Sequence, residues 1–374
     1  MKILIVGQTY VPAINRDKLH FLAKKADVTL LTPSYWKDDL FTFDGTQDSE
    51  VKHYMAGTVL NGHEKAYFYF PKLTMLINEI KPDIIEIDQG ANAVAYFQAI
   101  VMNKLFLGGR AKMGFFTWMN LPYANPFPFN SLEKYNLKNT DFAICGNRDA
   151  ERILREKQYK GNITVMPLLG INPLSFSKNA KTREKIREKL GIKNEFCIGF
   201  FGRTVKEKGA DDLITAVSKL KDKTVKLLII GRGAEKEKLV KLANDLGIAK
   251  QTIFMDSVLH DEVPQYMNAL DLFVLPSKTV PWWKEQFGHV VIEAMACEVP
   301  VIGSTCGEIP NVIGDAGLVF KEGNVDDLTA KITQVVQDKT LCKQLAKQGR
   351  QRILKSYTHE ILANKMFEIY KNIL

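Results

Sequence analysis

The stretch of sequence that decides the fold is Phe196-Cys197-Ile198-Gly199-Phe200-Phe201-Gly202-Arg203-Thr204-Val205-Lys206-Glu207-Lys208-Gly209. Its first six residues are almost wholly apolar and predict a buried strand, and a helix is expected to follow Gly209. Gly202 permits a tight strand exit and a close approach of the backbone to a ligand. Arg203 offers a bidentate fork for phosphate, and Lys208 offers a mobile positive charge. The stretch predicts a strand, an anion-binding turn and a helix, although a basic surface turn would carry the same residues.

Apolar strands alternate with amphipathic helices along the whole chain. In the first half we expect strands at 2–6, 28–31, 84–87, 113–116, 142–144 and 163–165, and helices near 15–25, 72–80, 90–105, 131–137 and 147–157. In the second half we expect strands at 196–201, 225–230, 252–255, 271–275, 300–302 and 317–319, and helices near 210–219, 234–245, 261–268, 288–296, 325–337, 339–354 and 358–373. This alternation predicts an α/β fold with parallel sheets and crossover helices.

Length and composition indicate two globular domains. A chain of 374 residues is too long for one ordinary core. The polar, proline-containing stretch 167–180 separates the two sets of elements, so we expect domains at 1–172 (with a helix at 357–374) and at 173–356. We find no apolar run of 18 residues, and the apolar start is too short for a signal peptide. The five cysteines are scattered, which predicts no zinc site or disulfide framework and favours a cytoplasmic location.

The net charge of +9 is spread over both halves of the chain. Such a field favours anionic ligands, and it favours peripheral contact with anionic lipid at the inner membrane face. No helix-turn-helix, zinc-finger or RNA-binding signature accompanies it, so we expect no nucleic-acid partner.

A second motif places Glu285 and Glu293 on either side of Gly288. Glu285 lies in a loop that follows the expected strand 271–275, and Glu293 lies about two turns into an apolar helix pattern. A helix N-terminus offers backbone N–H groups to an anion, and carboxylates accept hydrogen bonds from hydroxyls. The motif therefore predicts a ligand with both phosphates and hydroxyls. A helix with two solvated acids is the alternative, and it leaves a carboxylate among apolar neighbours unexplained.

Together, Gly202-Arg203, Lys208-Gly209 and the motif from Glu285 to Glu293 resemble the donor site of glycosyltransferase family 4. Segments 1–6, 81–85, 163–176, 254–258, 271–277 and 303–310 also resemble that family, so the resemblance runs over nearly the whole chain. It implies the GT-B fold, which has two facing Rossmann-like domains and a C-terminal helix that crosses back to the N-terminal domain. The N-terminal domain would serve the acceptor, and the C-terminal domain would bind a nucleotide sugar.

The resemblance also implies roles for particular residues. Arg203 and Lys208 would neutralise the donor diphosphate, and with Glu285, which would bind the transferred sugar, they are the predicted catalytic residues. The other predicted donor-binding residues are Gly202, Gly231, Met255, Val258, Phe287, Gly288, His289 and Glu293. Among these, Glu293 would hold the ribose, and the segment from Met255 to Val258 would edge the base. No loop carries an Asp-x-Asp pair, so we expect neither a metal nor another cofactor.

The chain departs from the common family pattern on the acceptor side. Met119 stands where many relatives have a histidine, in the stretch Thr117-Trp118-Met119-Asn120. The stretch resembles a branch of the family that carries Thr-Trp-x-Asn at this place. The predicted acceptor-side residues are Thr9, Tyr10, Trp118, Met119 and Asn120.

The sequence thus predicts a retaining glycosyltransferase of the hexosyltransferase class that uses a UDP- or GDP-sugar. Its acceptor would be a glycan, a lipid-linked molecule or a small molecule, in polysaccharide, glycan or glycolipid synthesis. A nucleotide-sugar epimerase or a phosphorylase of the same fold, and a non-catalytic sugar-nucleotide binding protein, are the alternatives. Donor sugar, base, acceptor, linkage and oligomeric state stay open.

Overall fold

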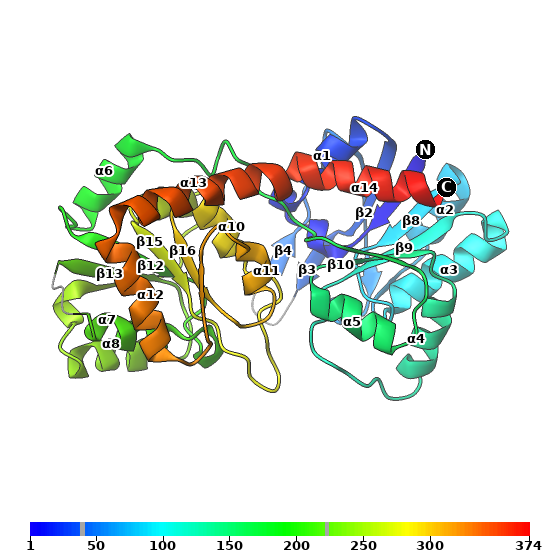
Figure 1. Ribbon diagram of the computed structural model, residues 1–374. Helices are drawn as coiled ribbons and strands as arrows, with labels where there is room; N and C mark the ends of the chain where they lie inside the picture. The colour runs from blue at the N-terminus through cyan, green and yellow to red at the C-terminus, as the bar shows by residue number, and fades with distance from the viewer. Residues whose placement is uncertain (38–41, 221–223) are drawn as a thin grey trace. The chain divides into compact units, whose positions relative to one another are not determined.

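A computed structural model describes residues 1–37, 42–220 and 224–374 (Figure 1). These residues form two compact units: Met1–Gly170 together with His359–Leu374, and Ile171–Thr358. Each unit contains one large, wholly parallel sheet with helices on its faces. The predicted fold class, with two Rossmann-like parallel-sheet domains, is confirmed. Within the described ranges, no helix is both long and apolar enough to cross a membrane.

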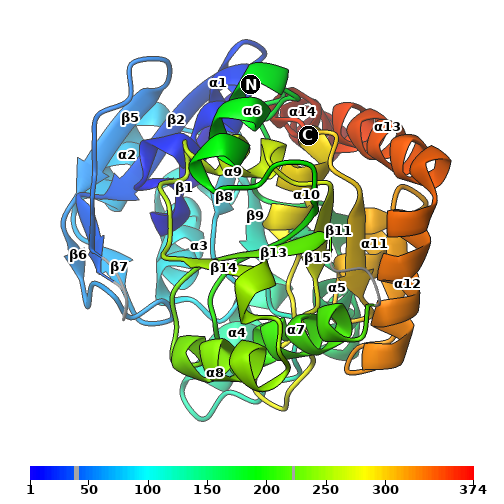
Figure 2. The same ribbon diagram turned by 90° about the vertical axis from the view of Figure 1, so that its left-hand side faces the viewer.

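The sheet of the N-terminal unit has the order β11-β10-β9-β8-β1-β2-β5. Its strands are β1 (Lys2–Val6), β2 (Asp27–Pro33), β5 (Lys52–Ala56), β8 (Ile84–Ile87), β9 (Lys112–Thr117), β10 (Phe142–Cys145) and β11 (Asn162–Val165). Two antiparallel hairpins add β3 (Tyr35–Lys37) with β4 (Thr42–Asp44), and β6 (Thr58–Val59) with β7 (Phe68–Tyr69). Figure 2 shows β5 at the outer edge of this sheet. The strand order reverses between β1 and β8, which are neighbours at the centre.

Helices cover both faces of this sheet. One apolar cluster joins the sheet to α1 (Asp17–Ala23) and α14 (His359–Ile373). A second cluster joins the other face to α2 (Lys72–Ile80), α3 (Val94–Leu107) and α5 (Arg148–Glu156), and α4 (Phe129–Lys138) packs beside α3. Figure 1 shows α14 alongside α1. Tyr370 of α14 is fully buried, and its hydroxyl donates to Glu86 Oε2 at 2.7 Å, so the last helix completes the N-terminal unit.

The sheet of the C-terminal unit has the order β14-β13-β12-β15-β16-β17. Its strands are β12 (Phe196–Phe201), β13 (Val225–Ile230), β14 (Thr252–Met255), β15 (Leu272–Leu275), β16 (Val301–Ser304) and β17 (Leu318–Phe320). Its helices are α6 (Ala180–Lys189), α7 (Ala210–Ser218), α8 (Lys236–Asp245), α9 (Val263–Asn268), α10 (His289–Ala296), α11 (Ile309–Ile313), α12 (Val325–Gln337) and α13 (Lys339–Ser356). Here the order reverses between β12 and β15.

The elements that the sequence does not predict lie at edges and surfaces. Edge strand β5 exposes Lys52 and Tyr54 on alternate positions, so it lacks the continuous apolar run of a central strand. Helix α6 is mostly charged, and only Ile186 and Arg187 of it are buried. The two hairpins and α11 are too short to give a periodic signal. The predicted helix start at residue 90 is wrong, because Ala93 is extended and α3 begins at Val94.

Two strand exits in the C-terminal unit approach each other more closely than side chains allow. A Cβ atom on Gly231, after β13, would lie 1.8 Å from the carbonyl oxygen of Gly202, after β12. Gly231 also has φ +153, a conformation that residues with side chains rarely adopt. The edge of the sheet where β12 and β13 end therefore requires glycine at residue 231.

We expect Gly231→Ala to lower the free energy of unfolding by roughly 3–5 kcal/mol, because it adds backbone strain to a backbone clash. Urea unfolding followed by circular dichroism measures this change. The matched control is Gly247→Ala, which has φ +72 but nothing within 4 Å of the added atom, and which should cost about 1–2 kcal/mol. Equal losses in the two variants would show that the close approach to Gly202 is not a constraint.

Candidate active site

The predicted donor residues gather at the point where the strand order of the C-terminal sheet reverses. Gly202 and Arg203 follow β12, and Pro276 and Ser277 follow the neighbouring β15. In open parallel sheets, ligands bind beyond the carboxyl ends of strands at such a reversal. The position alone makes this edge a candidate site.

Lys208 is placed by a short turn that packs on the exit of β15. The 3₁₀ helix Lys206–Lys208 ends at Gly209, which has φ +68. A Cβ atom on Gly209 would lie 2.0 Å from the carbonyl oxygen of Pro276. The backbone N–H of Lys278 donates to the carbonyl of Glu207 at 2.7 Å. These contacts hold the Lys208 turn against the loop that leads to Glu285.

The side chains of Lys208 and Glu285 form an ion pair. Lys208 Nζ lies 2.6 Å from Glu285 Oε2, and the two side chains are 15% and 9% exposed. The Ser277 hydroxyl donates to the same carboxylate oxygen at 2.9 Å. Lys208 Nζ also lies 4.7 Å from the centre of the Trp283 ring, which is a cation–π distance. Trp283 therefore contacts the cation of the pair, while Trp282 beside it is 74% exposed.

The backbone of Glu285 is held from the other side by the loop after β16. Its carbonyl accepts from the N–H of Glu308 at 3.2 Å, and its N–H lies 3.4 Å from Cys306 Sγ. A Cβ atom on Gly307 would lie 1.9 Å from the Glu285 carbonyl oxygen. The Lys208 turn and Ser277 thus hold the carboxylate of Glu285, and the loop after β16 holds its backbone.

Helix α10 begins directly after the loop that carries Glu285. Gly288 is its N-cap with φ +84, and no acidic residue lies in its first turn. Phe287 is buried, and its ring lies 4.8 Å from that of His289 and 5.7 Å from that of Tyr357. The first N–H groups of a helix have no intrahelical acceptor and carry partial positive charge. The N-terminus of α10 is therefore suited to an anion.

Arg203 differs from Lys208 in its environment. Its side chain is exposed, and it makes no ion pair or hydrogen bond within the described part of the chain. One of the two predicted phosphate-binding cations is thus free, whereas the other is neutralised by Glu285.

Glu293 lies in α10, more than one helix turn after Gly288. It contacts His260, which belongs to a different loop. His260 Nε2 lies 3.5 Å from Glu293 Oε1, whose side chain is 15% exposed. This interaction raises the pKa of His260 above its usual value, although burial of the ring opposes the shift. Met255 ends β14, and Val258 is half-buried in the loop between β14 and His260. The pair therefore connects α10 to the segment predicted to edge the base.

The five predicted acceptor-side residues belong to the N-terminal unit. Tyr10 is fully buried, so contact with a ligand would require its turn to rearrange. Trp118 packs closely on Gly146, and Asn120 is buried. Thr9 and Met119 are partly exposed. Their roles remain predictions.

Two residues of the site, Ser277 and His260, were not predicted from the sequence. Ser277 is a wholly buried hydroxyl after a strand, and only its hydrogen bond to Glu285 shows that it belongs here. His260 follows a β strand in a polar loop, and nothing in the sequence pairs it with Glu293.

No described residues form a group of three or more His, Cys, Asp or Glu side chains arranged to hold a metal ion. Metal independence remains a prediction.

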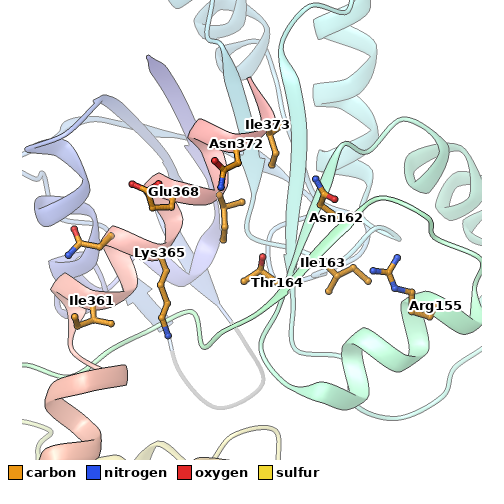
Figure 3. A pocket seen from close by; sticks show the side chains of 11 residues that line it. Arg155, Asn162, Ile163, Thr164, Ile361, Lys365, Glu368, Asn372 and Ile373 are labelled. Carbon is orange, nitrogen blue, oxygen red and sulfur yellow. The ribbon is translucent and has the colours of Figure 1, made fainter.

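A separate pocket lies in the N-terminal unit, between α14 and β11 (Figure 3). Its cavity of about 690 Å³ is lined by isoleucines together with Lys365 and Glu368 of α14. Arg155 lies at its rim, and its guanidinium donates to the carbonyls of Tyr159 and Gly161. The pocket contains none of the predicted site residues, and we assign it no role.

Comparison with known proteins finds similarity to glycosyltransferases. Residues 182–352 match the family model "Glycosyl transferases group 1". The chain is 29% identical to the capsular polysaccharide biosynthesis glycosyltransferase CapM of Staphylococcus aureus, over 63% of this chain and 62% of that protein. It is 27% identical to a GDP-mannose-dependent α-(1-6)-phosphatidylinositol monomannoside mannosyltransferase of Mycolicibacterium smegmatis, over 54% of each chain. The matches thus span about half to three fifths of these relatives' length.

Solved structures share the fold over the full length. Anabaena Alr3699/HepE in complex with UDP has a TM-score of 0.74 at 18% identity, with 100% of both chains covered. The lipopolysaccharide biosynthesis glycosyltransferase WaaG has a TM-score of 0.66 at 16% identity, with 99% of both chains covered. At these identities the likeness concerns the fold.

The stability that the His260–Glu293 pair contributes depends on pH. Because the pKa of His260 is raised in the folded protein, the pair contributes stability below the ordinary histidine pKa of about 6.5. That contribution is lost as the pH rises through the folded-state pKa. We expect NMR titration to give His260 a pKa above 6.5 in the wild type and a lower value in Glu293→Gln. An unchanged His260 pKa in that variant would contradict the pairing.

Proposed function

We propose that the protein is a retaining glycosyltransferase that transfers a sugar from a nucleotide-diphosphate sugar to an acceptor hydroxyl. The observation that carries the proposal is the Lys208–Glu285 pair at the strand-order reversal of the C-terminal sheet, where Arg203 follows β12, within the residues that match the glycosyltransferase group 1 model. The relatives named above for polysaccharide and glycolipid synthesis support a role in such a pathway.

The donor diphosphate would meet three positive features on one edge of the sheet. The free guanidinium of Arg203 can bind it bidentately, and Lys208 and the N-terminus of α10 supply further positive charge. Charge that develops on the leaving phosphate is stabilised by groups already held in place. Here, the contacts of Gly209 with Pro276 and of Gly307 with Glu285 provide that rigidity.

Donor binding then changes the partner of Lys208. In the structure its ammonium group donates to Glu285. A diphosphate carries more negative charge than a carboxylate, so Lys208 would move to the phosphate. Ser277 would keep hold of the Glu285 carboxylate. The released carboxylate would then accept hydrogen bonds from hydroxyls of the transferred sugar.

The reaction itself needs no protein nucleophile. The bond between the anomeric carbon and the diphosphate oxygen breaks, and a bond to the acceptor oxygen forms on the same face of the sugar. The proton of the acceptor hydroxyl goes to the leaving diphosphate. This route retains the anomeric configuration, and it assigns to Arg203 and Lys208 the charge stabilisation of the leaving group.

Glu293 would hold the ribose, and the loop from Met255 to Val258 would edge the base. The sugar nucleotide would carry uridine or guanosine, since Alr3699/HepE was solved with UDP and the mycobacterial relative is named for GDP-mannose. We propose that no metal or other cofactor takes part.

A cytoplasmic location with peripheral contact to anionic lipid belongs to the same proposal. The net charge of +9 and the exposed Leu105 and Phe106 beside Lys104 support the contact. Sedimentation with phosphatidylglycerol vesicles, but not with phosphatidylcholine vesicles, is the expected result. Equal recovery with both lipids would contradict it.

We expect Arg203→Ala, Lys208→Ala and Glu285→Ala each to lower kcat/KM for donor consumption by roughly 10²–10³-fold, because each removes a group that stabilises the transition state. The measurement is release of nucleoside diphosphate from UDP- and GDP-sugars, with and without acceptors. Lys206→Ala, which removes an exposed cation from the same turn, is the matched control and should change the rate less than about twofold. If all three variants retain wild-type turnover, the site assignment is wrong.

A substitution that removes only the charge of Glu285 tests the change of partner. Glu285→Gln removes the ion pair with Lys208, so UDP or GDP should bind about 5- to 10-fold more tightly while donor turnover falls. Isothermal titration calorimetry gives both dissociation constants. Unchanged affinity would mean that Lys208 does not exchange Glu285 for phosphate.

The products separate the alternatives. An epimerase releases isomerised donor without an acceptor, and a phosphorylase consumes inorganic phosphate. A non-catalytic binding protein shows tight nucleotide affinity and no product in any acceptor screen.

A further inference from the structure

A half-exposed histidine, His260, pairs with the carboxylate of Glu293 in the C-terminal unit. His260 Nε2 lies 3.5 Å from Glu293 Oε1, and the two side chains are 53% and 15% exposed. Across the described part of the chain, this carboxylate has no other ion pair or hydrogen bond. A carboxylate that is mostly removed from water needs such a partner, because burying an unpaired charge is costly. Since both side chains still reach solvent, both are accessible to a ligand.

A closed turn holds the backbone of His260 directly before α9. The N–H of Leu259 donates to Glu262 Oε2 at 3.1 Å, and the N–H of Glu262 donates to the carbonyl of Leu259 at 2.9 Å. The N–H of Val263 donates to the carbonyl of His260 at 3.3 Å. These bonds tie the turn to the start of α9, so the position of His260 does not depend on its pairing with Glu293.

The imidazole ring of His260 is held by a second contact. It meets the ring of Phe176 edge-to-face, with the ring centres 5.6 Å apart. Phe176 is buried, and its carbonyl accepts a hydrogen bond from Arg350 at 2.8 Å. Arg350 also donates to the carbonyl of Ala296, at the end of α10, at 2.8 Å. The imidazole therefore contacts an aromatic ring whose segment is tied to the helix that carries Glu293.

The pair contributes little that the fold lacks without it. Half-exposed ion pairs add little to stability, because water screens their attraction. Arg350 already links segment 173–176 to α10 through three backbone carbonyls. What the pair does restrict is the side chain of Glu293, which otherwise turns among several rotamers. Its effect is therefore to orient a carboxylate.

The charges around His260 favour its protonated form. Its interaction with Glu293 raises the pKa of His260, burial of the ring opposes the shift, and the charge of Asp261 adds to it. The packed elements also bring Arg350 of α13 and Cys297, after α10, near Glu293, and burial raises the pKa of the Cys297 thiol to about 12. A hydrogen bond between two charged groups is stronger than one with a neutral donor. The proton on His260 therefore strengthens its hold on Glu293.

We propose that protonated His260 is a positioning residue for donor binding, which holds the Glu293 carboxylate in place for the ribose hydroxyls of the nucleotide. This inference rests on the proposed function, in which Glu293 holds the ribose, and adds that donor affinity depends on the charge of His260. A carboxylate accepts hydrogen bonds from two neighbouring hydroxyls, and one that is already oriented loses less entropy when they bind. Affinity is thus higher when His260 is protonated and falls as the pH rises and the proton is lost.

The test is isothermal titration calorimetry of the full chain with whichever of UDP and GDP binds more tightly. In His260→Gln, which keeps a neutral hydrogen-bond donor, we expect Kd to rise about fivefold at about pH 6 and less than about twofold at about pH 8.5. Wild type and variant are compared at each pH, because the terminal phosphate of the nucleotide itself titrates near pH 6.

The 2′,3′-dideoxy form of the same nucleotide separates positioning from a purely structural role. It lacks both hydroxyls that Glu293 would hold, so His260→Gln should change its Kd less than about twofold at about pH 6. A structural defect would instead weaken the ribonucleotide and the dideoxynucleotide equally.

The matched control is His63→Gln, which removes an exposed histidine from the N-terminal unit and should leave both dissociation constants unchanged. NMR titration gives an independent readout. Saturation with the ribonucleotide should raise the pKa of His260, because a ligand that prefers the protonated form strengthens proton binding by the same factor.

Equal dissociation constants for wild type and His260→Gln at about pH 6, or equal weakening of the ribonucleotide and the dideoxynucleotide, would overturn the inference and leave the proposed function intact. If neither UDP nor GDP binds the wild type at either pH, the proposed function fails and the inference fails with it.

Discussion

The carbonyl oxygen of Gly202 occupies the space where a side chain on Gly231 would be, and much of the site depends on this contact. Parallel strands bring their carboxyl ends to one edge, and the exits of β12 and β13 can lie this close only without a Cβ atom. The Lys208 turn makes a similar contact with β15 through Gly209. Backbone packing at this edge therefore positions Arg203 and Lys208.

The charges at this edge are arranged unequally. Arg203 is exposed and free, whereas Lys208 is bound to a carboxylate that is itself hydrogen-bonded by Ser277. A buried ion pair contributes little net stability, because desolvation offsets most of its attraction. In the proposed function, an anionic ligand would separate Lys208 from Glu285.

Sequence patterns were reliable where strands are central and buried. The predicted strands 2–6, 84–87, 196–201 and 225–230 coincide with β1, β8, β12 and β13. The predicted strand 252–255 also coincides with β14, although β14 is half-buried and lies at the edge of its sheet. The patterns failed for β5 and α6, whose residues are half exposed and give no apolar run. Strand β15 begins at Leu272, one residue after the predicted start at Asp271.

The sequence by itself determined the alternation of strands and helices, the glycines after two central strands, and the kinds of charged residue beside them, because these depend on local periodicity and backbone freedom. Only the tertiary structure decided which charges pair. Lys208 meets Glu285 across 77 residues, and His260 meets Glu293 from another loop. It also left Asp88 and Asn92 buried with open polar atoms. Such contacts depend on strand order and side-chain packing, which no local pattern records.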